Sequence, residues 1–182
     1  MACYEYARLT KEEGIEVLKQ KFDTADKHQK NAVIGAAIKY CGLPGAIEFG
    51  RELLNLIDSD NEKDRKDGAY IIGAIANKNY YSPLIKLNKD VSSEVRQAAI
   101  IASGQIQNIS LIPYIFYARN DRTLQRYCKE SLAKFGGHAT QFIQEELGKI
   151  GVHDDIKLLR LLENHRSHGT TNSRQLTLTA GP

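Results

Sequence analysis

An internal repeat of about 30 residues is the feature that most constrains the fold of this chain. The stretch "EKDRKDGAYIIGAIANKNYYSPLIKLNKD" can be placed over the later stretch "SSEVRQAAIIASGQIQNISLIPYIFYARND". Three pairs of residues then coincide: Arg65 with Arg96, Gly73 with Gly104, and Ile75 with Ile106. Weaker copies lie on both sides, and the earlier copy has Lys30 in the position of the arginines. Repeats of this length predict stacked helix pairs, because one pair cannot bury its apolar face alone.

Apolar residues recur with helical spacing along most of the chain, so every predicted element is a helix. The first helix is expected to begin with a capping box in which Thr10 caps and Glu13 reaches back. Further helices are expected at about 26–41, 44–58, 61–76, 80–88, 92–107, 110–119, 122–135, 139–149 and 154–165. The helix over 97–106 is apolar on nearly every side and must be packed between neighbours. Gly73 and Gly104 are expected to let helices approach closely.

The polar residues of "DVSSEVRQAAIIASGQI" fit a boundary between repeats better than a catalytic site. Ser92 or Ser93 is placed to cap the following helix. Asp90, Val95-Arg96, Gly104 and Ile106, followed by "LIP" at 111–113, resemble a HEAT repeat of the short kind first noted in phycobilin lyase subunits. The resemblance implies a ladder of hydrogen bonds between repeats, which uses Asp90 with Arg96 and in which Arg65 repeats the role.

The same resemblance implies an all-α chain folded as a right-handed α-solenoid of about four to five HEAT-like helix pairs. This domain would occupy residues 1–166, and residues 167–182 would form a polar tail that is disordered or a linker. A solenoid is compatible with many functions, so the fold alone predicts none.

Charge and cysteine content narrow the classes of function. Lys and Arg number 25 against 22 Asp and Glu, so the chain lacks the strong positive field of a typical nucleic-acid or membrane-surface protein. Three widely spaced cysteines are typical of reduced thiols in the cytoplasm. The N-terminus does not read as a signal peptide, and no apolar run approaches the ~20 residues of a membrane-spanning helix. We therefore expect a cytoplasmic protein without a membrane segment in this chain.

Enzymatic alternatives find little support in the residues. HEAT-like deoxyhypusine hydroxylases hold iron through paired His-Glu dipeptides, and this sequence has none. The pair His165 and His168 lacks a carboxylate or cysteine at ligand spacing, so no metal and no cofactor are predicted. HEAT-like DNA glycosylases suggest a third hypothesis, a DNA-binding or base-excising protein that uses the basic residues from Arg119 to Lys134 around Tyr127. Acidic residues dilute that stretch, so nucleic acid is not the expected partner.

The candidate partner-binding residues lie on the second helices of the repeats, which would line the concave face of a solenoid. They are Tyr114, Tyr117, Lys86, Lys89 and Arg119. Tyrosines beside lysines form an amphipathic surface suited to a protein partner. The alternative is that the two rings only cover the neighbouring repeat.

The last predicted helix has more apolar residues than one buried stripe requires. Leu158, Leu161 and Leu162 are therefore candidate contacts to another repeat, another domain or a second copy of the chain. The leading hypothesis is a non-enzymatic scaffold that binds a protein partner, or another part of its own polypeptide, through the concave face. The alternative is a regulatory cytoplasmic domain, because the repeats also look like the HEAT segment of bacterial membrane proteins similar to ATP/ADP transporters.

Overall fold

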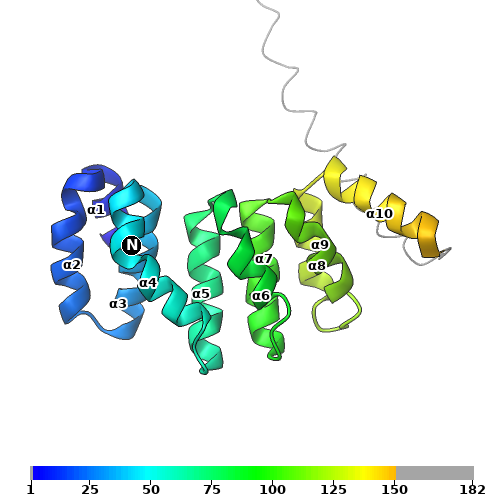
Figure 1. Ribbon diagram of the computed structural model, residues 1–182, viewed down its shortest axis with the longest axis horizontal. Helices are drawn as coiled ribbons and strands as arrows, with labels where there is room; N and C mark the ends of the chain where they lie inside the picture. The colour runs from blue at the N-terminus through cyan, green and yellow to red at the C-terminus, as the bar shows by residue number, and fades with distance from the viewer. Residues whose placement is uncertain (1, 151–182) are drawn as a thin grey trace, which may run out of the picture.

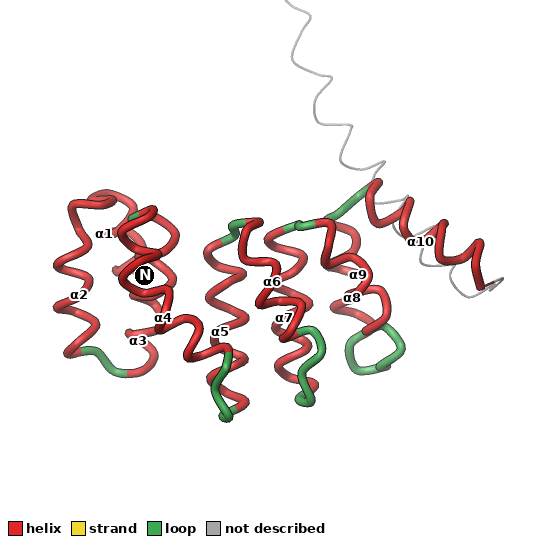
Figure 2. Tube along the Cα trace, viewed as in Figure 1, coloured by secondary structure: helices red, strands yellow, loops and turns green. Residues whose placement is uncertain are grey.

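All the regular elements of the described part of the chain, residues 2–150, are helices (Figure 2). They form an elongated array in a computed structural model, running from α1 and α2 at one end to α10 at the other (Figure 1). The N-terminal part contains α1 (Ala2–Thr10), α2 (Ile15–Thr24), α3 (Lys27–Tyr40) and α4 (Gly42–Ile57). The repeated part follows with α5 (Glu62–Ile75), α6 (Tyr81–Leu87), α7 (Ser93–Ile106), α8 (Ile112–Ala118), α9 (Gln125–Lys134) and α10 (Gly137–Ile150). Short 3-10 turns precede α2, α6 and α8, at Lys11–Gly14, Lys78–Tyr80 and Ile109–Leu111.

Helices α3, α5, α7 and α9 form one continuous row in which each packs against the next. The short helix α6 packs against α5 and α7, and the short helix α8 packs against α9 and α10. As expected for a helix packed on several sides, α7 buries residues around most of its circumference, and Ala98, Ala99 and Ile100 are fully buried, whereas Gln105 is exposed. The row of long helices therefore carries the core, and α6 and α8 cover it.

The close spacing between neighbouring helices of this row depends on two glycines. A Cβ atom added at Gly104 would lie 2.9 Å from Cα of Ser131 on α9, and one added at Gly73 would lie 3.2 Å from Cα of Ala102 on α7. Both distances are shorter than ordinary contacts, so a larger residue would push the helices apart. The predicted role of these glycines in close helix approach is confirmed.

The predicted helix boundaries are confirmed within a few residues from α3 to α10, and Ser92 caps α7 by accepting a hydrogen bond from the Val95 N–H at 3.4 Å. The predicted start of the chain is wrong. Residues Ala2–Thr10 already form a helix, and Thr10 makes no capping bond because its Oγ1 donates to the Tyr6 carbonyl oxygen at 2.9 Å. The capping pattern was misleading because Thr10 continues a helix that precedes it. Pro44 lies inside α4, which begins at Gly42.

No helix among residues 2–150 is long and apolar enough to cross a membrane. The helix predicted at 154–165, with Leu158, Leu161 and Leu162, and the tail predicted at 167–182 lie outside the described residues, as does the histidine pair His165 and His168.

Candidate binding site

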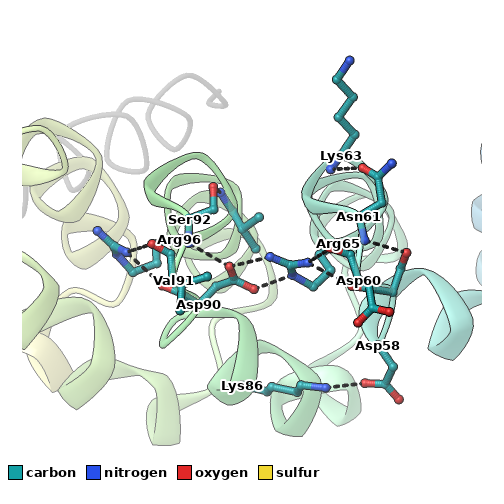
Figure 3. A network of polar contacts seen from close by, with 12 residues as sticks. Asp58, Asp60, Asn61, Lys63, Arg65, Lys86, Asp90, Val91, Ser92 and Arg96 are labelled. Carbon is teal, nitrogen blue, oxygen red and sulfur yellow. Dashed lines mark hydrogen bonds and ion pairs between the residues drawn. The ribbon is translucent and has the colours of Figure 1, made fainter.

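Two arginine–aspartate pairs tie successive repeats together beside the candidate surface, and Figure 3 shows the first of them, Arg65 with Asp90. Arg65 donates from Nε and Nη2 to the two carboxylate oxygens of Asp90, at 2.7 and 2.9 Å. Its Nη1 donates to the backbone carbonyls of Ser59 and Asp60, both at 2.9 Å. The guanidinium thus joins the loop before its own helix to the loop before the next one. Because Arg65 donates hydrogen bonds to the charged form, it holds the pKa of Asp90 below the ordinary value of an aspartate.

Arg96 repeats this arrangement one unit later. Its Nη1 donates to the carbonyls of Asp90 and Val91 at 2.8 and 3.0 Å, and its Nη2 donates to Asp121 Oδ2 at 2.8 Å. Each aspartate also accepts from a backbone N–H in its own turn, Asp90 from Ser92 and Asp121 from Thr123, both at 2.9 Å. The ladder predicted for Asp90 and Arg96 is present, with one refinement. Each arginine bonds the backbone of its own loop and the carboxylate of the following loop.

Each arginine–aspartate pair forms one rung of this ladder. A cavity of about 460 Å³ lies where α6, α7 and α8 meet, next to the second rung, Arg96 with Asp121. Among the residues that line it are Asn88, Lys89, Arg96, Tyr114, Tyr117 and Asp121. Three of the five predicted partner-binding residues are therefore brought together, namely Lys89, Tyr114 and Tyr117. The volume lies in the range typical of small-ligand sites, so a few residues of a bound chain would fit.

The two tyrosines differ in their contacts. Tyr114 is half-buried, and the Lys89 ammonium lies 4.9 Å from the centroid of its ring. Tyr117 is 50% exposed, yet its hydroxyl donates to Glu146 Oε2 of α10 at 2.6 Å and its ring meets Phe116 edge-on. Tyr117 thus combines both roles considered for it, since it lines the cavity and also holds the next repeat. Tyr114 is the better candidate for a residue that contacts only a ligand.

The other two predicted partner-binding residues lie outside this cavity. Lys86 is exposed and forms an ion pair with Asp58 at 2.6 Å, which is visible in Figure 3. Arg119 is half-buried, and its guanidinium stacks on the Phe116 ring with Cζ 4.1 Å from the ring centroid. Burial lowers the pKa of Arg119. Both side chains are engaged by the protein itself, which makes them weaker candidates for a direct ligand contact.

The basic stretch considered for nucleic acid is also partly neutralised. Arg126 lies 3.4 Å from Glu130 on its own helix and 5.1 Å from the centroid of the Tyr127 ring. Cys128 on the same helix is buried, and burial raises the pKa of its thiol to about 12. A thiol with such a pKa stays protonated at neutral pH and is a poor nucleophile. In the part of the chain that the structure describes, no group of three or more His, Cys, Asp or Glu side chains could hold a metal ion.

Asn88 is one of the lining residues that the sequence did not identify as binding residues. It is buried at the end of α6, and its Nδ2 donates to the Leu84 carbonyl at 2.8 Å and to Ser103 Oγ at 3.0 Å. A comparison of the repeats could have identified it, because the residue that corresponds to Asn88 in the preceding repeat is an isoleucine, Ile57. A polar residue that replaces a buried isoleucine marks a position where packing alone does not explain the choice.

No protein-family model matches the chain, and no curated protein matches it either.

Proposed function

We propose that the chain is a non-enzymatic interaction scaffold, built as a right-handed HEAT-like helical solenoid. In this proposal it binds a protein partner, or another part of its own polypeptide, through the surface formed by α6 and α8. The row of long helices serves as a rigid support, and the short helices carry the contacts. Binding sites on rigid elements lose little conformational freedom when they bind, which favours affinity.

One observation carries this proposal. Lys89 from the end of α6 and Tyr114 from α8, two residues from different repeats, meet at the same cavity in ring-to-ammonium contact. Tyrosine is among the residue types enriched where proteins bind proteins, and the lysine beside it adds a charge that can steer a complementary partner. The ladder rung between Arg96 and Asp121 lies in the wall of this hollow, so the repeat boundary and the binding surface share residues.

Site-directed photocrosslinking in cells of the source organism tests the proposal. A photoreactive phenylalanine derivative that replaces Tyr114 should give a discrete covalent adduct with one protein. The same derivative at Tyr70, which is 44% exposed on α5, is the matched control and should give none. Excess unlabelled wild-type protein should compete the adduct away, whereas the Tyr114→Ala variant should not compete.

Thermal melting accompanies this experiment. Tyr114→Ala should melt close to the wild type, because the ring is only half-buried and its described partner is the exposed Lys89. Tyr117→Ala should melt lower, because it removes the hydrogen bond to Glu146. Equal adducts at both positions, or none at Tyr114, contradict the proposal, as does a collapse of melting in Tyr114→Ala.

A further inference from the structure

Asn88, one of the residues that line the cavity, carries a hydrogen-bond acceptor that lacks a donor. Asn88 is 5% exposed, and its Oδ1 has no hydrogen-bond partner among the described residues. The orientation of its amide is fixed by the network. Ser103 Oγ donates to the Ala99 carbonyl at 2.7 Å and must therefore accept from Asn88 Nδ2. Turning the amide round would place Oδ1 against the Leu84 carbonyl oxygen, and two acceptors repel each other.

A buried acceptor without a donor destabilises the fold, because it has lost its hydrogen bonds to water and gained none in return. The preceding repeat avoids this cost with Ile57, which is buried at the equivalent place. Asn88 is not required by Ser103 either, since the serine hydroxyl already donates to Ala99 within its own helix. The unfilled Oδ1 is thus the group in this cavity that most needs an N–H or O–H donor from outside the repeat.

Next to Asn88 in the sequence lies a cation, Lys89, that is exposed and available to an anion. The Lys89 ammonium is 4.9 Å from the centroid of the Tyr114 ring, and within residues 2–150 no carboxylate lies within ion-pair distance of it. The neighbouring cations differ, because Lys86 pairs with Asp58 and Arg96 with Asp121. A ligand carboxylate would therefore find Lys89 able to pair without breaking an existing ion pair.

We propose that the cavity binds an extended acidic peptide segment of a partner protein. A backbone N–H of the peptide donates to Asn88 Oδ1, an Asp or Glu side chain pairs with Lys89, and the apolar part of the segment packs on Tyr114 and Pro113. Asn88 Oδ1 exposes less than 1 Å² to solvent, so the lining side chains move on binding, a common change at interfaces. This inference rests on the proposed function and adds the chemistry of the partner.

A peptide fits these groups better than a nucleic acid does. A phosphate backbone needs several cations in a row, whereas Arg96 in this cavity is already neutralised by Asp121. A single acidic residue in an extended peptide offers one group to each. Its backbone N–H can donate to Asn88 Oδ1, and its side-chain carboxylate can pair with the Lys89 ammonium. The two groups belong to consecutive residues, Asn88 and Lys89, so one extended segment can reach both.

Fluorescence anisotropy with capped heptapeptides tests the inference on the full chain. The probes carry Asp or Glu at the centre and mixed residues elsewhere, and matched pools carry Asn or Gln, or Lys, at the centre. The acidic pool should bind, and the other two should bind at least tenfold more weakly. Lys89→Met should weaken binding of the acidic pool about tenfold, Lys89→Arg should retain it, and Lys86→Met is the control that should leave it unchanged.

Asn88→Ile separates a binding role from a structural one. It copies the residue of the preceding repeat, so the melting temperature should stay level or rise while acidic-peptide binding falls about tenfold. Equal binding of the acidic and neutral pools overturns the inference, as does unchanged binding in Asn88→Ile. Tighter binding of a single-stranded oligonucleotide that Lys89→Met abolishes would assign the cavity to nucleic acid instead. A specific crosslink at Tyr114 without acidic-peptide binding would leave the proposed function standing and refute only this inference.

Discussion

Successive helices are joined by different polar contacts in two regions of the chain, from α5 to α9 within the repeated part and between α3 and α5 at the end of the N-terminal part. In the repeated part the separation between donor and acceptor recurs, because Arg65 and Arg96 each reach an aspartate 25 positions later. Between α3 and α5 the contacts are Lys27 with Asp64, Asn31 with Asp67, and Lys39 with the Ala74 carbonyl. These contacts lie along the helices and none of them joins a helix to the next loop.

The difference can be traced to two residues. The backbone N–H groups of Lys30, Arg65 and Arg96 all donate to the carbonyl of their N-cap residue, so the three side chains occupy the same place in their helices. The Lys30 ammonium, however, lies 4.9 Å from the centroid of the Phe22 ring. Ser59 stands where Asp90 stands, since its Oγ accepts from the Asn61 N–H at 3.1 Å as Asp90 accepts from Ser92. A single-point donor and a neutral acceptor do not make the bidentate pair that Arg65 forms with Asp90.

Removing the first rung is expected to have the largest effect. Asp90→Asn leaves the Arg65 guanidinium, whose side chain is only 14% exposed, without its carboxylate. Losing one partner of such a pair costs about 3 kcal/mol of unfolding free energy, which urea denaturation followed by circular dichroism can measure. Asp58→Asn is the matched control, because its partner Lys86 is exposed and the loss should be small.

The pH dependence of unfolding checks the same rung. The pKa of Asp90 is lower in the folded chain than in the unfolded one, so its stabilising contribution is present above the unfolded pKa, about 4. The contribution is lost as the pH falls through the lower, folded pKa. The wild type should therefore lose stability more steeply on acidification than Asp90→Asn. Parallel pH profiles for the two proteins would show that the rung does not stabilise the fold.

The next largest effect on stability is expected from replacing one glycine in each part with alanine. Gly104→Ala would force its Cβ against the α9 backbone at Ser131 and cost about 2 kcal/mol. Gly50 on α4 has no atom within 4 Å of its added Cβ, so Gly50→Ala should stabilise by up to about 1 kcal/mol through helix propensity. Thermal melting of both variants measures the contrast. A stabilising Gly104→Ala would mean that α7 and α9 can separate at no cost.

The smallest effect is expected from building the missing rung. Ser59→Asp alone should destabilise, because Ser59 Oγ lies 3.1 Å from Asp64 Oδ2 and the new carboxylate would meet that charge. Lys30→Arg together with Ser59→Asp should recover part of the loss, with a coupling free energy of about 0.5 kcal/mol in a double-mutant cycle. A coupling free energy of zero would show that an arginine at position 30 cannot reach position 59 as Arg65 reaches Asp90.

Sequence reasoning predicted the features that repeat locally and missed those set by contacts between distant segments. Arg65, Arg96, Gly73 and Gly104 were found because period and helix chemistry coincide at each of them. The first helix was missed because Thr10 and Glu13 imitate a helix start, whereas Thr10 bonds back to Tyr6. The hydrogen bond from Tyr117 to Glu146 depends on where α10 returns, which neither residue's neighbours in the sequence encode.

Within the candidate site, the tyrosines and Lys89 were predicted from residue type, but Asn88 was not. The role proposed for Asn88 depends on its Oδ1 atom having no hydrogen-bond donor, and this can be seen only in the hydrogen-bond network of the folded chain. The comparison of Asn88 with Ile57 across repeats would have identified the position as unusual, although not as a ligand contact.

The arginine–aspartate rungs also have a mechanical consequence. Each rung joins one loop to the next, so tension applied to the two ends of this part of the chain passes through the rungs in series. In such a series the weakest link yields first. The Arg96–Asp121 pair, with side chains 23% and 33% exposed, is more open to competing water than the Arg65–Asp90 pair, at 14% and 9%. Under load, the array should therefore begin to peel between α7 and α9, at the wall of the cavity, before the preceding repeat gives way.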